Sequence, residues 1–253
     1  MLVQGENYTL YKGDCLEVMK EIPDKSVDMI LCDLPYSVTK NSWDKLIPFD
    51  KLWEQYNRVI ADNGAIVLFA QGMFTSELMQ SNKKMWRYNL IWEKDRPSGF
   101  LNAKRMPLRS HEDICVFYKK QPVYNPQFWE GKPLHGMGSK FREGKLANNN
   151  YGKFSSNTNP SALREGDTTK YPRSILKFPK PHPPIHPTQK NVTLCEWLIR
   201  TFTNENMTIL DNCMGSGTSG IATLNVGEGR KFIGIELQDI YFNISCARLE
   251  GRV

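Results

Sequence analysis

Short apolar runs alternate with amphipathic segments over most of this 253-residue chain, and this alternation limits the fold more than any other feature. The runs at 26–32, 65–69 and 230–236 have the length and β-branched content of buried strands. Between such runs, segments such as 192–202 place apolar residues on one face of a helix. Strands that alternate with helices build a largely parallel sheet. The sequence therefore predicts an α/β fold, either as one domain or as one domain with a large insertion.

The order of the expected elements follows from these periods and from the Gly and Pro residues that interrupt them. We expect strands at 8–12, 26–32, 65–69, 88–92, 113–118, 207–211 and 230–236. We expect helices at 16–22, 46–60, 74–81, 192–202, 218–226 and 238–249. From about residue 119 to residue 187 the periodicity vanishes, and Gly, Pro, Asn and Lys dominate. A stretch of that length inside a compact domain is normally functional or disordered.

Positive charge is concentrated in one part of the chain. Residues 95–190 hold 17 Lys and Arg against 7 Asp and Glu, a net charge of +10, whereas the rest holds 16 against 20, a net charge of −4. Aromatic residues are interleaved with the basic ones, and this mixture suits phosphate contacts together with base stacking. The pattern predicts a region that binds a polyanion, with Lys140, Arg142 and Lys145 as candidate contacts. The alternative is a lysine-rich surface that only faces water.

The cysteines and histidines argue against a metal centre and against a disulfide framework. The six cysteines form no C-x-x-C pair, and His182 and His186 have no cysteine or carboxylate close in sequence. Several cysteines lie inside apolar runs, which favours free thiols in a reducing cytosol. No apolar stretch has the length of a membrane span, and residues 1–6 lack a signal-peptide pattern. We therefore expect no metal, no membrane contact and a cytoplasmic location.

The residues Asp33-Leu34-Pro35-Tyr36 follow the predicted strand 26–32, at the carboxyl end where open α/β sheets place their ligands. The Asp33 carboxylate accepts hydrogen bonds and cannot donate them. Pro35 restricts the Leu34 carbonyl, and Tyr36 offers a flat face on which a planar base could stack. A fixed set of acceptors beneath a ring suits an aromatic amine as substrate. The alternative is a strand that ends in an ordinary proline turn.

A second informative stretch is 207–218, where a strand ends at Asp211 and a Gly-Ser-Gly turn at 215–217 precedes a helix. The glycines allow the backbone to approach a ligand closely at a helix N-terminus. The turn lacks the lysine of a P-loop and the full spacing of a dinucleotide fingerprint, so a nucleotide phosphate is not its obvious ligand. Glu236 ends the next strand, 25 residues after Asp211, where an acid can hold a ribose diol. A plain surface carboxylate is the alternative.

In these motifs and their order, the sequence resembles DNA amino-methyltransferases that use S-adenosylmethionine. The resemblance is to the circularly permuted beta group, in which the catalytic motif precedes the cofactor motif. Residues 33–36 match the family's Asp-Pro-Pro-Tyr, and 211–218 match its Asp-Pro-Phe-x-Gly-Ser-Gly-Thr loop. The segment 186–190 matches the His-Pro-Thr-Gln-Lys that opens the helix before that loop, and 13–15 and Glu236 match other cofactor contacts. The resemblance covers nearly the whole chain outside 119–185.

The resemblance implies a Rossmann-like, seven-stranded, mostly parallel sheet of the class I methyltransferase type, with an irregular basic insertion for DNA recognition. The strand 8–12 would lie beside the strand that ends at Glu236. The implied catalytic residues are Asp33, Leu34, Pro35 and Tyr36. The implied cofactor-binding residues are Asp14, Cys15, Lys190, Asp211, Asn212, Cys213, Gly215, Ser216, Gly217, Thr218 and Glu236. Leu34 in place of a proline and 212–213 in place of Pro-Phe depart from the family pattern.

The resemblance also implies a division of labour along the chain. Residues 1–118 would form the catalytic half, 119–185 the target-recognition insertion, and 186–253 the cofactor-binding half. The implied activity is transfer of a methyl group from S-adenosylmethionine to the exocyclic N6 of adenine, in a base flipped out of double-stranded DNA. Both N–H groups of that amine would point at the Asp33 carboxylate and the Leu34 carbonyl.

Several alternatives to this activity stay open at the level of the sequence. The same scaffold could methylate N4 of cytosine or a base in RNA. A non-catalytic DNA-binding protein is the alternative from a different class. The sequence also leaves open the recognition sequence, a homodimer, and a cognate restriction endonuclease as partner.

Overall fold

The structure, a computed structural model, describes residues 1–37, 45–133, 168–183 and 189–251. These residues belong to two compact units, Met1–Asn125 together with Ser174–Val253, and Pro126–Arg173. The first unit contains the whole large sheet and every described helix. No helix in the described ranges is long and apolar enough to cross a membrane. The functional division of the chain at residues 118 and 185 stays a prediction.

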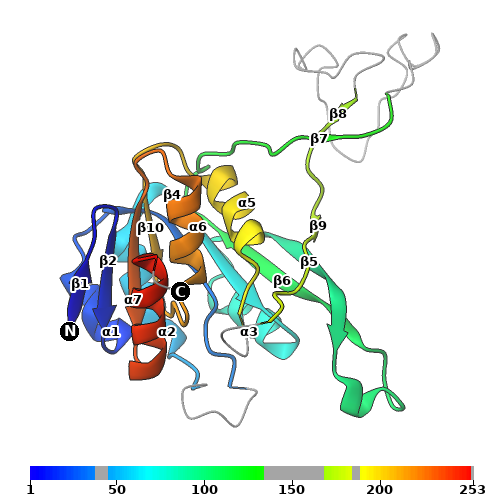
Figure 1. Cartoon of the computed structure of the whole chain (residues 1–253), viewed down its shortest axis with the longest axis horizontal. Helices are drawn as coiled ribbons and strands as arrows, with labels where there is room; N and C mark the ends of the chain where they lie inside the picture. Colours follow the sequence, from blue (N-terminus) through cyan, green and yellow to red (C-terminus); the bar gives the residue numbers. More distant parts are fainter. Residues whose placement is uncertain (38–44, 134–167, 184–188, 252–253) are drawn as a thin grey trace. The chain divides into compact units, whose positions relative to one another are not determined.

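The described part of the first unit is organised around one large sheet (Figure 1). In spatial order its strands are β1 (Leu2–Gln4), β2 (Tyr8–Lys12), β11 (Lys231–Glu236), β10 (Thr208–Asp211), β3 (Val27–Cys32), β4 (Ile60–Ala70), β6 (Arg109–Phe117), β5 (Trp86–Ser98) and β9 (Ile175–Lys177). The strands from β2 to β4 in this order pair in parallel, and β6 is antiparallel to both of its neighbours. The predicted mostly parallel α/β sheet is thereby confirmed.

The two edges of this sheet differ from the prediction. The seven inner strands are the expected ones, and β2 pairs with β11 as expected, with Lys12 opposite Glu236. The edge strands β1 and β9 were not predicted. Each has only three residues, and one or two alternating side chains give no readable period. β9 is extended because it pairs in parallel with β5, where Ile91 lies opposite Ile175.

Helices cover both faces of the sheet, and two separate hydrophobic cores result. One face packs against α5 (Val192–Phe202), α6 (Thr218–Val226) and α7 (Asp239–Leu249). The other packs against α1 (Cys15–Val18), the 3-10 helix η1 (Met19–Glu21), α2 (Phe49–Val59) and α3 (Met73–Ser81). A further 3-10 helix, η2 (Phe100–Asn102), lies in the loop between β5 and β6. The result is a three-layer α/β/α arrangement.

The central strand β3 shows why the continuous apolar run at 27–32 becomes a strand. Met29 and Leu31 are buried in the core under α5 and α6, whereas Ile30 and Cys32 are buried in the core under α2. Successive side chains of a strand point to opposite faces, so a strand covered on both faces must be apolar at nearly every position. The strand therefore ends at Cys32, directly before the carboxylate of Asp33.

The chain reverses its winding direction between β3 and β10. These two strands are parallel neighbours, with Leu210 opposite Ile30. The chain leaves β3 toward α2 on one face and leaves β10 toward α6 on the other. Such a reversal opens a crevice at the carboxyl ends of the two strands, and this is where ligands bind in open α/β sheets. Asp33 and Asp211 both lie at this crevice.

The second unit, as far as it is described, is a small two-stranded element. β7 (Trp129–Glu130) pairs with β8 (Thr169–Lys170) in antiparallel fashion. Its aromatic residues pack on each other, since the ring centroids of Phe128 and Tyr171 are 4.9 Å apart. The Arg173 guanidinium lies 5.2 Å from the centroid of a Trp129 ring. The predicted DNA contacts Lys140, Arg142 and Lys145 lie outside the described residues.

Candidate active site

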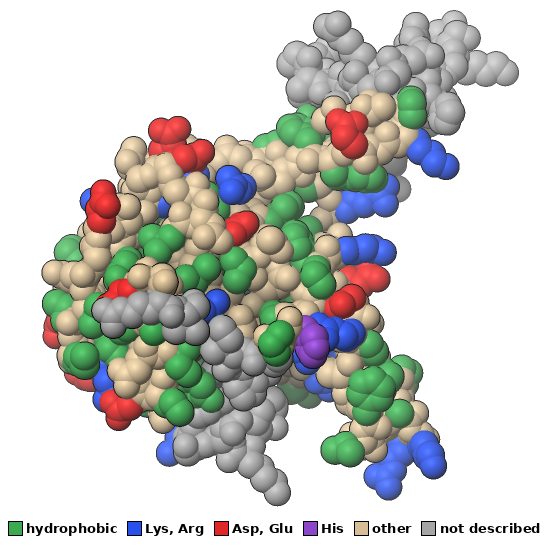
Figure 2. Space-filling view, in the orientation of Figure 1, with side chains coloured by type: hydrophobic (Ala, Val, Ile, Leu, Met, Phe, Trp, Pro, Cys, Tyr) green, Lys and Arg blue, Asp and Glu red, His purple; other side chains and the backbone are tan. Residues whose placement is uncertain are grey.

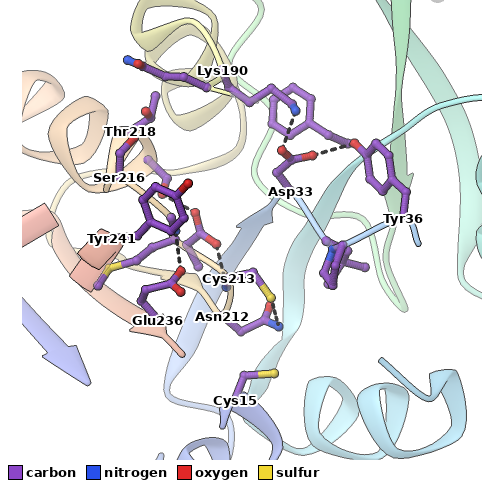
Figure 3. A pocket seen from close by; sticks show the side chains of 18 of the residues that line it. Cys15, Asp33, Tyr36, Lys190, Asn212, Cys213, Ser216, Thr218, Glu236 and Tyr241 are labelled. Atoms are coloured by element: carbon purple, nitrogen blue, oxygen red, sulfur yellow. Dashed lines mark hydrogen bonds and ion pairs between the residues drawn. The ribbon is translucent and has the colours of Figure 1, made fainter. Parts of the chain in front are cut away.

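One cavity of the first unit, of about 680 Å³, lies at the carboxyl ends of β3, β10 and β11. It joins the two motifs that lie far apart in the sequence (Figure 3). The predicted catalytic and cofactor-binding residues that line it are Asp14, Cys15, Asp33, Leu34, Pro35, Tyr36, Lys190, Asp211, Asn212, Cys213, Gly215, Ser216, Thr218 and Glu236. Gly217 is the one residue of the predicted catalytic and cofactor-binding set that does not line it. The fold therefore brings together the predicted set, and the role of each residue stays a prediction.

At one end of the cavity, the Asp33 carboxylate has a partner on each oxygen. The Tyr36 hydroxyl donates to Oδ1 at 2.6 Å, and the Lys190 ammonium donates to Oδ2 at 2.5 Å. One face of the Tyr36 ring stacks on Phe74, with ring centroids 4.7 Å apart. The Leu34 side chain is buried in the core beneath α2, which fixes the backbone between Asp33 and Tyr36. These contacts hold the motif in one conformation.

Two further charged side chains complete this end, and the sequence did not predict them. Glu112 of β6 lies 3.4 Å from Lys190 through Oε2, and its Oε1 accepts from Lys94 of β5 at 3.0 Å. Lys94 and Lys190 are 3% and 8% exposed at their side chains, so neither ammonium is substantially hydrated. Burial of a charge is costly unless the charge is paired. The four groups carry two positive and two negative charges and neutralise one another.

The ionisation of this cluster follows from its pairing. Burial favours the neutral amine of Lys190, but Asp33 and Glu112 outweigh that effect and raise the pKa of Lys190 above its usual value. Burial also favours the neutral acid of Glu112, but Lys190 and Lys94 hold the pKa of Glu112 below its usual value. Burial raises the pKa of Asp33, although Lys190 opposes the shift. Lys190 is therefore protonated at neutral pH and available as a donor.

At the other end of the cavity, the loop after β10 is held by its own backbone. Asp211 accepts from the Cys213 N–H at 3.1 Å and also from the Ser219 hydroxyl. Burial raises the pKa of Asp211 to about 6, against these two hydrogen bonds. Gly215 and Gly217 have φ angles of +53° and +77°, in the left-handed region that favours glycine. The two predicted glycines thus occupy positions whose positive φ angles other residues rarely adopt.

The same loop is locked from outside by Glu236 and Arg248. Glu236 accepts from the Gly215 N–H at 2.9 Å and from the Gln238 N–H at 2.7 Å. Arg248 of α7 donates to the Ser216 carbonyl at 2.6 Å. Burial raises the pKa of Glu236, although these backbone donors oppose the shift. Figure 3 shows Glu236 and Tyr241 at the opposite end of the cavity from Asp33 and Tyr36.

The segment 13–15 lies beside Glu236, as the pairing of β2 with β11 requires. The Gly13 N–H donates to the Glu236 carbonyl at 3.0 Å. The Asp14 side chain caps α1 by accepting from the Leu16 N–H at 2.8 Å. A hydrogen bond with the Cys213 thiol lowers the pKa of Cys15. The two ends of the chain therefore build the same end of the cavity.

Asn212 and the thiols beneath the cavity have structural partners. The Tyr56 hydroxyl donates to Asn212 Oδ1 at 2.6 Å, with both residues buried. The Cys32 thiol contacts Cys213, and burial raises the pKa of Cys32 to about 12. Such a thiol is a poor nucleophile at neutral pH. No group of three or more His, Cys, Asp or Glu side chains suited to a metal ion occurs in the described part of the chain.

The sequence predicts Lys190 as a cofactor contact; in the structure its ammonium contacts Asp33 and Glu112 at the catalytic end, and its role toward the cofactor stays a prediction. The sequence did not predict Glu112, Lys94 or Arg248. One signal was available for the first two: Lys94 continues the alternation of Leu90 and Trp92, and Glu112 directly precedes the predicted strand 113–118. An ionisable residue on the buried side of a strand needs a partner. The identity of that partner could not be read from the sequence.

The sequence and the fold of the chain are similar to those of DNA methyltransferases. A sequence profile of the family described as DNA methylase matches residues 27–246. The chain is 27% identical to the DNA adenine methyltransferase YhdJ of Escherichia coli (strain K12), over 97% of this chain and 84% of that protein. It is also 27% identical to the Type II methyltransferase M2.LlaDCHI of Lactococcus lactis subsp. cremoris, over 97% of this chain and 90% of that one. The crystal structure of an M1.HpyAVI–SAM complex is similar with a TM-score of 0.63 and 26% identity, over 96% of this chain and 100% of that one.

Proposed function

The chain belongs to the DNA methylase family, and we propose that it is an adenine-specific DNA methyltransferase. It transfers a methyl group from S-adenosylmethionine to the exocyclic N6 of an adenine that is flipped out of double-stranded DNA. The observation that carries this proposal is the cavity with Asp33 and Tyr36 at one end and Glu236 at the other (Figure 3). Such a cavity can hold a cofactor and a base with their reacting atoms adjacent. The adenine assignment is supported by the relative that is named an adenine methyltransferase.

The residues around Glu236 fit the cofactor. Glu236 is buried and offers carboxylate lone pairs beyond those used by two backbone donors, as a ribose diol requires. Gly215 lines the cavity and has no side chain, so the backbone there can come close to a ligand. Asp14 lines the cavity and would accept from an adenine amino group. S-adenosylmethionine supplies a methyl group on a positively charged sulfur, and M1.HpyAVI was crystallised with that cofactor.

The residues around Asp33 fit the reacting amine. The lone pair of an exocyclic amine is delocalised into the base, so the nitrogen is a poor nucleophile. If its two N–H groups donate to the Asp33 carboxylate and the Leu34 carbonyl, the nitrogen becomes more tetrahedral as it attacks. The nitrogen then forms a bond to the methyl carbon as the carbon–sulfur bond breaks, and the electron pair stays on the sulfur. The nitrogen loses one proton, which Asp33 accepts and passes to water.

Positioning supplies much of the rate in this mechanism. The methyl carbon must lie in line with the sulfur and the nitrogen, near van der Waals contact. Tyr36 rests on Phe74 through one face, and the base would stack on Tyr36 through the other. No covalent intermediate with the protein is needed. The buried Cys32, next to the motif, is a packing residue.

The hairpin between β5 and β6 supports the DNA part of the proposal. Figure 2 shows apolar and basic side chains together at its end. At its tip, Phe100, Leu101 and Met106 are 69%, 101% and 56% exposed. Residues 96–110 contain four basic side chains and no acidic one: Arg96, Lys104, Arg105 and Arg109. Basic side chains bind phosphates, and an exposed apolar side chain can enter a base step.

The remaining part of the DNA-binding region is assigned by charge alone. The cluster at 140–145 belongs to the basic stretch 95–190 and keeps its predicted role as a phosphate contact. Double-stranded DNA is the proposed partner. The relative named a Type II methyltransferase supports a restriction–modification setting, in which a cognate endonuclease would cut the same site unmethylated.

The test of this function is to identify the methylated base. The chain is incubated with bacterial genomic DNA that lacks adenine methylation and with S-adenosylmethionine labelled on its methyl group. The DNA is digested to nucleosides, which are separated by chromatography. We expect the label in N6-methyldeoxyadenosine. Label in N4-methyldeoxycytidine would reassign the substrate to cytosine, and unlabelled DNA would contradict the proposed activity.

A further inference from the structure

The Lys190 ammonium occupies the place that the proposed target base needs. Its Nζ lies 2.5 Å from Asp33 Oδ2 and 6.0 Å from the centroid of the Tyr36 ring. These are the carboxylate and the ring that would hold the amine and the plane of the base. An amine that donates to Asp33 Oδ2 while its base stacks on Tyr36 would therefore compete with this ammonium for the same space. Lys190 is 8% exposed at its side chain, so an ammonium that leaves Asp33 and stays buried needs another partner.

The carboxylate of Glu112 lies beside the Lys190 ammonium. Oε2 of Glu112 lies 3.4 Å from Lys190 Nζ, within ion-pair distance. This oxygen is buried and accepts no hydrogen bond from any described residue. A buried carboxylate oxygen without a donor is uncommon and calls for an explanation. The other oxygen of Glu112 is held by Lys94 at 3.0 Å, which fixes the direction in which Oε2 points.

We propose that Glu112 is a positioning residue that receives the Lys190 ammonium when the target base enters, and that Lys94 holds Glu112 in place for this exchange. The inference rests on the proposed function and adds to it a step that precedes methyl transfer. Lys190 moves from Asp33 Oδ2 to Glu112 Oε2, and the amino group of the base takes the vacated oxygen. No covalent bond is made or broken in this step, and no proton is transferred.

The exchange solves an electrostatic problem of this site. Separating a buried ion pair is costly when one of its charges is left without a partner. With Glu112 present, the ammonium exchanges one carboxylate for another, and the cluster keeps two positive and two negative charges. Asp33 gains a neutral donor in place of a cation, so its charge acts on the reacting amine. Without the charge of Glu112, Lys190 would stay on Asp33 and compete with the base.

The test uses the full chain with Glu112→Gln, which keeps the size of the side chain and removes its charge. We expect kcat to fall. KM for DNA should stay within about threefold because phosphate contacts provide most of the DNA affinity, and the cofactor Kd should also stay within about threefold. The fall in kcat should be about 10- to 100-fold, as for loss of a hydrogen bond to a charged group. The matched control is Glu93→Gln on β5, where the carboxylate is 44% exposed and pairs with the exposed Lys177. That control should keep the wild-type kcat.

A double-mutant cycle separates positioning from plain structural support. In a Lys190→Met background there is no ammonium to receive, so adding Glu112→Gln should change kcat less than about threefold. A merely structural Glu112 would lower kcat equally in both backgrounds, and that result would overturn the inference. Glu112→Asp, which keeps the charge, should recover part of the wild-type kcat. Thermal unfolding of each variant shows whether it is folded at the assay temperature.

The outcomes distinguish this inference from the proposed function. An active wild type together with an undiminished Glu112→Gln variant would overturn the exchange alone. A wild type that labels no base in genomic DNA would overturn the proposed function and the exchange with it. A variant that fails to bind the cofactor by calorimetry would show that Glu112 acts on the fold of the site, and would also overturn the exchange.

Discussion

At the cofactor end of the cavity most polar contacts use backbone groups, and some of them are local, whereas at the catalytic end the contacts join side chains, several of them from distant parts of the chain. Glu236 accepts from the N–H of Gln238, two positions later. Asp33 accepts from the ammonium of Lys190, 157 positions later. A turn that forms locally brings its own contacts, but a distant pair needs the whole strand order. We therefore expect substitutions at the catalytic end to change turnover, and those at the cofactor end to change stability and cofactor affinity.

Asp33→Ala is expected to give the largest difference between the effect on turnover and the effect on cofactor affinity. It removes the acceptor for the reacting amine and leaves the contacts of Glu236 untouched. We expect methyl transfer to fall by about 1,000-fold or more, which is the order of effect of losing a group that acts on the transition state. The cofactor Kd, measured by calorimetry, should stay within a few-fold of wild type.

Asp33→Asn separates the effect of the charge of this residue from the effect of its acceptor oxygen. The amide keeps an acceptor oxygen but carries no charge, so its turnover should lie between those of wild type and Asp33→Ala. Turnover is measured with labelled cofactor at saturating DNA. Normal turnover in Asp33→Ala would remove this residue from the mechanism, and a large loss of cofactor affinity would erase the distinction between the two ends.

The next effect concerns Asp211 and pH. Burial raises the pKa of Asp211 from 3.8 to about 6, so the folded state binds its proton more tightly than the unfolded state. The tighter proton binding therefore stabilises the folded state fully below about pH 4, where Asp211 is protonated in both states. This contribution to the free energy of unfolding decreases as the pH rises to about 6 and is lost at higher pH. The loss is about 3 kcal/mol in the free energy of unfolding.

Asp211→Asn, which cannot titrate, measures this loss. Urea unfolding of variant and wild type is compared at about pH 4 and about pH 8. Between about pH 4 and about pH 8, the unfolding free energy of the variant minus that of wild type should increase by about 3 kcal/mol. Asp50→Asn, at an exposed position of α2, is the control and should show a much smaller change. A difference that is independent of pH would contradict the prediction.

A smaller effect is expected from Gly217→Ala at the cofactor end. Gly217 has a φ of +77°, and a Cβ there would lie 2.9 Å from Leu249 Cδ1 and 3.0 Å from Ser245 Cβ. We expect a loss of about 1–3 kcal/mol in the free energy of unfolding and weaker cofactor binding. Gly227→Ala is the control, since its φ is +66° but its nearest contact is 3.7 Å away. Equal losses in both variants would mean that backbone strain alone decides the effect.

The smallest effect is expected at the hairpin, outside both ends of the cavity. A Lys104→Ala, Arg105→Ala variant should bind DNA more weakly, and the log–log slope of affinity against salt should become shallower by about 0.9 for each phosphate that the variant no longer binds. Fluorescence anisotropy of labelled duplex DNA over a salt series gives the slope. Lys231→Ala, an exposed charge at the amino end of β11, is the control and should keep it. An unchanged slope in the hairpin variant would make this basic tip an ordinary surface.

Much of the fold could be predicted because each element carries its own period. β2, α5 and α6 begin and end at the predicted residues. β5 and β6 run beyond the predicted 88–92 and 113–118. Their outer halves are polar and largely exposed, and they are extended because they pair with each other, with Ser98 opposite Arg109. The amino-acid composition of these outer halves does not predict that pairing.

The sequence by itself determined where the chemistry lies along each element. Asp33 and Asp211 follow apolar runs, and Glu236 ends one, because a buried strand stops where charge begins. Only the tertiary structure decided that Lys190 meets Asp33 and that Glu112 lies between two lysines. The strand order β3, β4, β6, β5 sets these neighbours, and it depends on the packing of the whole sheet. Two buried lysines need the two partly buried carboxylates beside them, so this partnership exists only in the folded chain and cannot be read from spacing along the sequence.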